Sequence, residues 1–139
     1  MTLVVPNQGE RLMLDAATGK TTPATPWTLR LFVNNHTPAN GDTEADYTEA
    51  AGGGYAAIPL DETAWTTTPG SPTASVQPQQ TFTFTGALTA NASIYGYYVT
   101  DDNDKLVYAE KLAAPFQPQN LGDNLKVTAR LTLGSVSGD

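Results

Sequence analysis

Cysteine is absent from this sequence, and histidine occurs once in its 139 residues, at position 36. The lack of cysteine excludes disulfides, thiolate metal sites and cysteine nucleophiles. His36 has no second histidine with which to form a metal site, and its neighbours in "NNHTP" are typical of a loop. The sequence therefore predicts a protein that is not an enzyme and that requires no cofactor.

Positive charge is also scarce, and it is unevenly distributed. No lysine or arginine lies between Arg30 and Lys105, whereas nine acidic residues do, and the formal net charge of the chain is -7. Nucleic acids and anionic membranes bind proteins through lysine and arginine, so we expect neither as a partner. No stretch approaches the ~20 apolar residues of a membrane span. The N-terminus lacks the basic region of a signal peptide, so we expect synthesis in a cytoplasm.

Helical patterns are rare, because 12 glycines and 10 prolines divide the chain into short segments. Residues 6–20 form the one helical pattern, with Asn7 as the N-cap, Glu10 three residues later and Gly19 at the C-terminus. A strand through the same segment is the alternative. The buried side of the helix is predicted to consist of Leu12, Met13, Ala16 and Ala17.

From Trp27 to Leu133 the chain has the period-two pattern of β-strands. Two alternating runs flank the turn residues 101–104, which predicts a β-hairpin. The whole pattern predicts one domain, residues 1–139, folded as a mainly β, antiparallel β-sandwich that is jelly-roll-like. Residues 1–26 form its N-terminal arm with the short helix, and residues 134–139 form a flexible tail. The predicted core residues are Leu29, Leu31, Phe82, Phe84, Val127 and Leu131.

The stretch "QQTFTFTGAL" predicts a strand with one apolar and one threonine-lined face. Phe82 and Phe84 point to the core, and Val76 lies earlier in the same predicted strand. Pro78 interrupts that strand, which indicates a sheet edge or a bulge. The opposite face, with Thr81, Thr83 and Thr85, is either exposed sheet or a contact between subunits, because threonine favours strands and forms hydrogen bonds across a seam.

Two acidic runs are weak candidates for calcium binding, since carboxylate oxygens are the ligands that calcium prefers. Neither run matches the spacing of an EF-hand loop, and loops are often acidic because they are solvated, so the prediction is that no metal is bound. The candidate ligands are Asp42, Glu44, Asp46 and Glu49 in the first run, and Asp101, Asp102 and Asp104 in the second.

Several segments together resemble a group of small virion structural proteins of tailed bacteriophages. The segments are "VVPNQGERLML", "LRLFVNNHTP", "ADYTEAAGGGYAAIPL", "QQTFTFTG", "YGYYVTDDNDKLVYAEKL" and "GDNLKVTARLTL", and the similarity extends over residues 3–133. The resemblance implies a β-sandwich protein of the capsid decoration or cement type. Such a protein binds the major capsid protein on the exterior of the virion and stabilises contacts between capsid subunits. It also implies a homotrimer, and it carries over no catalytic residue.

The alternative function is a tail or fibre component that binds a host receptor or a glycan. In either role the chain binds other molecules through its surface, so aromatic residues away from the predicted core and exposed acids are the candidates. The interface candidates are Phe32, Asp42, Glu44, Asp46, Glu49, Tyr95 and Tyr98.

Overall fold

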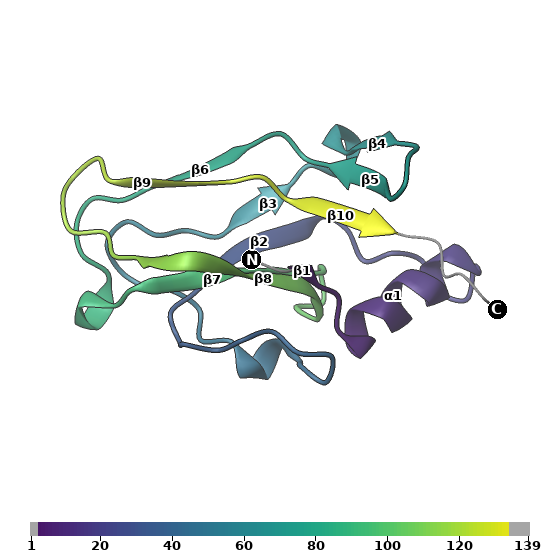
Figure 1. The fold of residues 1–139 in the computed structure, drawn as a ribbon, viewed down its shortest axis with the longest axis horizontal. Coiled ribbons are helices and arrows are strands. Elements are labelled where there is room, and N and C mark those ends of the chain that lie inside the picture. The colour runs from purple at the N-terminus through teal and green to yellow at the C-terminus, as the bar shows by residue number, and fades with distance from the viewer. Residues whose placement is uncertain (1–2, 134–139) are drawn as a thin grey trace.

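The computed structural model describes residues 3–133, and the predicted tail at 134–139 lies outside the described residues. Two layers of antiparallel strands face each other, with a helix at one end (Figure 1). The first layer has the strand order β1-β8-β7-β2-β3. Its strands are β1 (Leu3–Val4), β2 (Trp27–Phe32), β3 (Ile58–Leu60), β7 (Ile94–Thr100) and β8 (Leu106–Phe116).

The second layer is built on a long, interrupted strand pair. Its strands are β4 (Thr66–Thr68), β5 (Thr73–Val76), β6 (Gln80–Thr83), β9 (Asn124–Val127) and β10 (Arg130–Leu133). β5 pairs with both β4 and β10, and β6 pairs with β9. Gln80 lies opposite Val127 and Val76 opposite Arg130, so residues 77–79 face only residues 128–129. The segment that contains Pro78 thus has one residue more than the segment opposite it. The extra residue makes a β-bulge, which is one of the two alternatives that Pro78 indicated.

The mainly β, antiparallel architecture with one short N-terminal helix is therefore confirmed. The hairpin at residues 101–104 is also confirmed, since β7 pairs with β8 across it. Asp104 takes a positive φ of 61° in this turn, a conformation that aspartate tolerates better than most residues. Three short 3-10 helices lie in the loops: η1 (Glu44–Asp46), η2 (Glu62–Ala64) and η3 (Thr89–Asn91).

The helix α1 (Asn7–Ala17) includes Asn7, which the sequence predicted to be the N-cap just before the helix. Pro6, not Asn7, is the N-cap, and the Asn7 N–H donates to the carbonyl of Asn40 at 2.8 Å. Gly19 follows the C-cap with a φ of 77°, as expected for a C-terminal glycine. Gly9 is buried against the backbone of Val107, where a Cβ would clash, so the helix lies directly on β8. Of the predicted buried side, Leu12, Met13 and Ala16 are half-buried and Ala17 is exposed.

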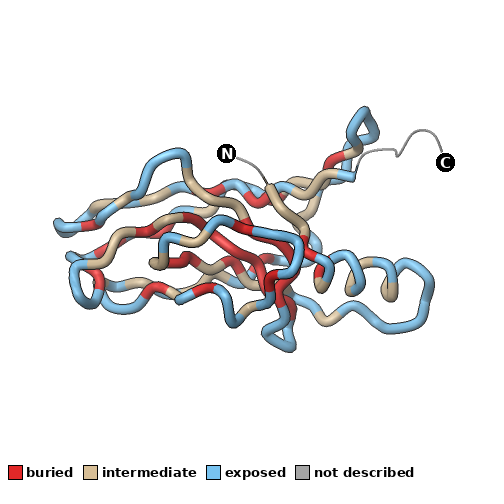
Figure 2. Tube along the Cα trace, turned by 60° about the horizontal axis from the view of Figure 1, so that its bottom comes forward, coloured by how far each residue is buried: buried red, intermediate tan, exposed pale blue. Residues whose placement is uncertain are grey.

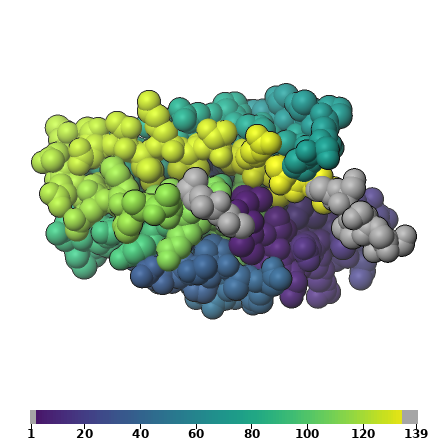
Figure 3. Space-filling view, in the orientation of Figure 1, coloured from purple at the N-terminus to yellow at the C-terminus, as the bar shows by residue number. Residues whose placement is uncertain are grey.

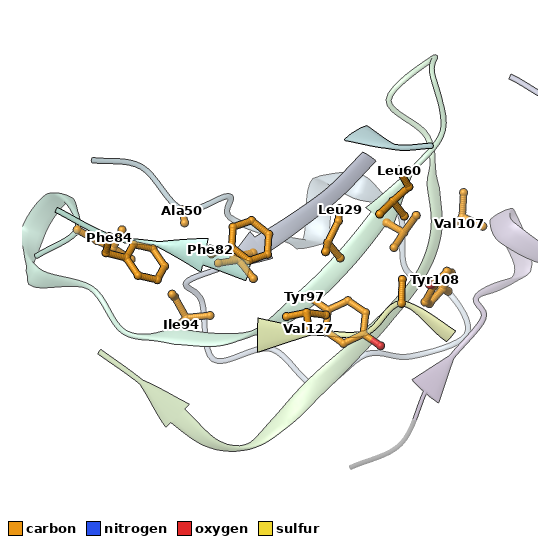
Figure 4. Close-up of a cluster of buried hydrophobic side chains, with 14 residues drawn as sticks. Leu29, Ala50, Leu60, Phe82, Phe84, Ile94, Tyr97, Val107, Tyr108 and Val127 are labelled. Atoms are coloured by element: carbon orange, nitrogen blue, oxygen red, sulfur yellow. The ribbon is translucent and has the colours of Figure 1, made fainter. Parts of the chain in front are cut away.

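The main core lies between the two layers (Figure 4). Five of the six predicted core residues are buried there, and the sixth, Leu131, is half-buried against the same cluster. Val76, in β5, is half-buried. The bulge at Pro78 reverses the alternation, so that Ser75 rather than Val76 lies opposite Leu131 on the inner face.

A second, smaller core covers the opposite face of the first layer. It consists of Phe32, Tyr47, Tyr98, Leu106 and Ala109, with Tyr95 packed against it. Tyr47 comes from the long acidic segment after β2, and its ring stacks on Tyr98 with centroids 5.1 Å apart. Many of the buried positions lie in the strands of the first layer, and the turns between strands are mostly exposed (Figure 2). The first layer is thus covered on both faces by its own chain.

Replacing Phe84 with alanine should destabilise the protein strongly. Its side chain is fully buried, so Phe84→Ala should lower the free energy of unfolding by about 3–5 kcal/mol, through lost transfer energy and the cavity left behind. The neighbouring Thr83 is exposed, and Thr83→Ala should change it by less than about 0.5 kcal/mol. Urea denaturation of both variants measures the difference, and equal effects would contradict the two-faced strand.

Candidate functional site

Arg30 joins the two acidic runs to the outer side of the first layer. On β2 its side chain points away from the main core, between Leu29 and Leu31. Its Nη1 atom donates to both carboxylate oxygens of Glu49, at 3.0 and 3.1 Å, and its Nη2 atom donates to Asp104 at 3.0 Å. Its Nε atom donates to the Thr100 hydroxyl at 2.9 Å. All parts of the guanidinium group are therefore bound, and we call these contacts the Arg30 clamp.

Tyr55 extends the clamp into the main core. Its hydroxyl donates to Glu49 at 2.8 Å and accepts a hydrogen bond from the Leu31 N–H at 3.2 Å. Burial and the neighbouring Glu49 carboxylate raise the pKa of Tyr55 far above its ordinary value. The phenol therefore stays protonated and serves as a fixed donor.

Glu44 forms a second connection between the acidic segment and the rest of the fold. Its carboxylate accepts hydrogen bonds from Gln8 Nε2 at 3.0 Å, from Lys105 Nζ at 3.1 Å and from the Leu106 N–H at 3.4 Å. Partial burial would raise the pKa of Glu44, but these hydrogen bonds and one from its own backbone outweigh burial and lower the pKa to about 2. The ionised carboxylate is thus part of the folded structure.

Asp42 organises the turn that precedes η1. Its Oδ2 atom lies 2.7 Å from His36 Nε2 and accepts hydrogen bonds from the Tyr47 hydroxyl at 2.7 Å and the Ala39 N–H at 2.9 Å. Burial would raise the pKa of Asp42, and the contacts with His36, Tyr47 and Ala39 outweigh it, so the pKa is lowered. The single histidine therefore holds a loop in place.

The remaining calcium candidates either accept hydrogen bonds within their own loops or are exposed to solvent. Asp46 accepts a hydrogen bond from the Thr43 N–H, and Asp101 accepts from the N–H groups of Asn103 and Lys105. The Asp102 side chain is exposed. Within residues 3–133 no group of three or more histidine or acidic side chains is arranged to hold a metal ion.

Three of the predicted interface residues are wrong, because the chain itself covers them. Phe32 has no exposed surface, and Tyr98 and Asp42 are 4% and 7% exposed. Sequence patterns placed the two aromatic residues away from the main core but could not reveal the second core that buries them. Glu44, Glu49 and Tyr95 are half-buried and Asp46 is exposed, so these four stay predictions.

The sequence interpretation missed Arg30 as a central residue. The signal was present, because Arg30 occupies an outward position in a strand and is the last cation before a long acidic interval. What the sequence could not supply was the pairing of β2 with β7, which places Arg30 beside the turn that carries Asp104.

The outer face of β6 and β9–β10 is a regular surface of exposed residues. Cross-strand pairing places Thr81 beside Lys126 and Thr83 beside Asn124. Within the described part of the chain, Lys126 and Arg130 take part in none of the ion pairs. β9 and β10 run along the visible surface in yellow (Figure 3). We call this surface the threonine face; its members are all exposed: Thr81, Thr83, Thr85, Asn124, Lys126, Thr128 and Arg130.

The two sets of charged side chains therefore differ in their contacts as well as in their position. The acidic residues nearest the first layer are bound to Arg30, Lys105 and backbone N–H groups, whereas the threonine face presents hydroxyls, an amide and two cations to solvent. A surface of this kind can form hydrogen bonds and ion pairs with another protein.

Comparisons with protein-family models, with curated proteins and with solved structures find no match for this chain. In residues 3–133 there is no helix of the length and apolar character needed to cross a membrane.

Glu44 should make the stability of the protein sensitive to acid. Because its pKa in the folded state lies below the ordinary value of 4.5, its stabilising contribution is present above that value and is lost as the pH falls toward about 2. Glu44→Gln should cost about 1 kcal/mol at pH 7 and flatten the loss of stability below pH ~5.

Thermal unfolding between neutral and acidic pH tests this expectation. Asp102→Asn is the matched control, since it removes the same charge from an exposed side chain in the neighbouring acidic run. Parallel pH profiles for wild type and Glu44→Gln would show that the Glu44 contacts do not stabilise the fold.

Proposed function

We propose that this chain is a decoration or cement protein of a tailed-bacteriophage capsid, and that it binds the major capsid protein on the outer surface of the shell. The observation that carries the proposal is the threonine face, which is exposed, regular and free of the internal pairing that occupies the acidic residues. The sequence resemblance to small virion structural proteins supports the choice of partner.

The chemistry of the threonine face suits a protein surface. Threonine hydroxyls form hydrogen bonds at little conformational cost, because the branched side chain is already restricted in a strand. Lys126 and Arg130 add charge that can pair with acidic groups of the shell and guide the approach. This assignment moves the contact away from the acidic segment 42–49, where Glu44 and Glu49 already have cationic partners.

Self-association into a homotrimer forms part of the proposal. A trimer placed over a three-fold position of the shell multiplies weak contacts, because the second and third copies bind at a high effective concentration. Among residues 3–133, three large apolar side chains remain exposed and are available for contacts between copies or with the shell: Leu14, Leu121 and Leu133.

Purified particles should contain the chain in high copy number. A protein that covers the shell is expected at on the order of hundreds of copies per particle, following the symmetry of the capsid. Quantitative mass spectrometry and cryo-electron microscopy of particles from the phage that encodes the chain test this. A few to a few tens of copies at the tail would support the alternative function, binding of a receptor or glycan, and refute decoration.

Reversing the charge of the threonine face should weaken shell binding. We expect Lys126→Glu with Arg130→Glu to reduce the affinity for shells that lack the protein at least about tenfold at low salt, and less at high salt. The control is Arg11→Glu with Lys20→Glu, which changes the net charge equally at two exposed residues in and after α1. Equal loss in both pairs would indicate net charge alone and would contradict a contact through this face.

Sedimentation should detect the trimer. At tens of micromolar protein, analytical ultracentrifugation is expected to give the mass of three chains, each of 14.7 kDa. A stable monomer in solution together with monomeric density on the shell would refute the trimer while leaving decoration possible.

A further inference from the structure

Two tryptophans, the only two in the chain, form a corner at the edge where the layers meet. The ring centroids of Trp27 and Trp65 are 5.7 Å apart and the ring planes are inclined at 76°. Both side chains are half-buried, so part of each ring remains accessible. The corner opens into a pocket of about 250 Å³, lined by Thr25, Trp27, Glu62, Trp65, Ser75 and Leu131.

The chain between β3 and β4 forms one wall of this pocket. Asp61 caps η2, since its carboxylate accepts hydrogen bonds from the N–H and the hydroxyl of Thr63 at 2.9 and 2.8 Å. The buried Gln77 holds the same residue by donating to the Asp61 carbonyl at 2.7 Å. Glu62 begins η2 and Trp65 directly follows its last residue, and both side chains line the pocket.

The other walls come from both layers. Trp27 is the first residue of β2 and lies opposite Leu60, the last residue of β3. Its ring therefore lies beside the segment that follows β3. Ser75 and Leu131 lie opposite each other in the β5–β10 pair and face inward. The Ser75 hydroxyl accepts a hydrogen bond from Thr67 at 2.9 Å and keeps its own proton available for a ligand.

The pocket is electronegative and has no counter-charge of its own. Glu62 is exposed, and among residues 3–133 it has neither an ion-pair partner nor a side-chain hydrogen bond. None of the lining residues is basic. The faces of tryptophan rings carry negative electrostatic potential and attract cations more strongly than the other aromatic side chains do. A carboxylate beside two such rings complements positive charge.

We propose that this pocket binds a lysine or arginine side chain of a partner protein. The cationic group lies against the tryptophan rings and pairs with Glu62, while the methylene stem contacts Leu131. Two rings that meet at a steep angle form a corner that suits a compact cation, whereas a sugar ring stacks on a flat aromatic platform. The inference goes beyond capsid decoration and does not depend on it, because the isolated chain can be tested with a small cation.

Choline is the probe, and the intrinsic fluorescence of the protein is the readout. Because Trp27 and Trp65 are the only tryptophans, all tryptophan emission reports on this pocket. Choline chloride, exchanged for sodium chloride at constant ionic strength, should change the emission saturably with a dissociation constant on the order of millimolar. Its neutral isostere, 3,3-dimethyl-1-butanol, should bind more weakly by about threefold or more.

Two variants assign the effect to the pocket. Glu62→Gln should weaken choline binding by about threefold to tenfold, and Trp65→Phe should weaken it while Trp27 still reports the titration. Glu10→Gln is the control, because it removes a carboxylate from an exposed position on α1, away from the lining residues. Thermal unfolding of each variant shows that the fold is retained.

Three outcomes would overturn the proposal. The first is an emission that choline does not change in a saturable way, and the second is an equal effect of choline and its neutral isostere. The third is equal choline binding by Glu62→Gln and Glu10→Gln. A response to methyl glucosides in preference to choline would make the pocket a neutral glycan site instead. None of these outcomes bears on the capsid experiments, which measure copy number, self-association and binding through the threonine face.

Discussion

The Arg30 clamp is the interaction on which the arrangement of the surface depends. One guanidinium group holds Glu49 from the acidic segment and Asp104 from the β7–β8 turn, two segments that are otherwise separated along the chain. With both carboxylates bound, the acidic segment lies across the first layer and brings Tyr47 onto Phe32 and Tyr98. The clamp thus helps to shield the outer face of the first layer from solvent. The outer face of the second layer remains exposed to solvent.

The Arg30 clamp and the small core beneath it contribute differently to stability. Burying a large apolar side chain such as Phe32 stabilises a protein by about 1.5–3 kcal/mol, whereas ion pairs with partial exposure contribute about 1 kcal/mol or less. The aromatic contacts therefore supply most of the attraction. Arg30 adds direction, because its rigid, planar guanidinium group donates from fixed positions, with Nη1 bound to Glu49 and Nη2 bound to Asp104. Gly96 completes the fit, since a Cβ there would collide with the ring of Phe32.

Local patterns predicted the elements well and the contacts between distant elements poorly. The alternation around Phe82 and Phe84 and the turn at residues 101–104 are local signals, and the structure has both. Whether Phe32 and Tyr98 face a partner or their own chain depends on a loop that closes over them, and alternation within a strand cannot reveal it. The pocket between Trp27 and Trp65 depends on the register of two strand pairs and was not visible for the same reason.

The bulge at Pro78 connects the two binding surfaces that we propose. Without the extra residue, the register of β6 and β9 would continue and place Val76 opposite Leu131. The wall of the tryptophan pocket would then be apolar, and Ser75 would point outward. With the bulge, Ser75 turns toward the pocket, while Val76 joins Arg130 on the outer side. Because proline has no N–H to donate to the ladder, it suits a bulge position, and the same residue thereby determines the composition of both faces of the second layer.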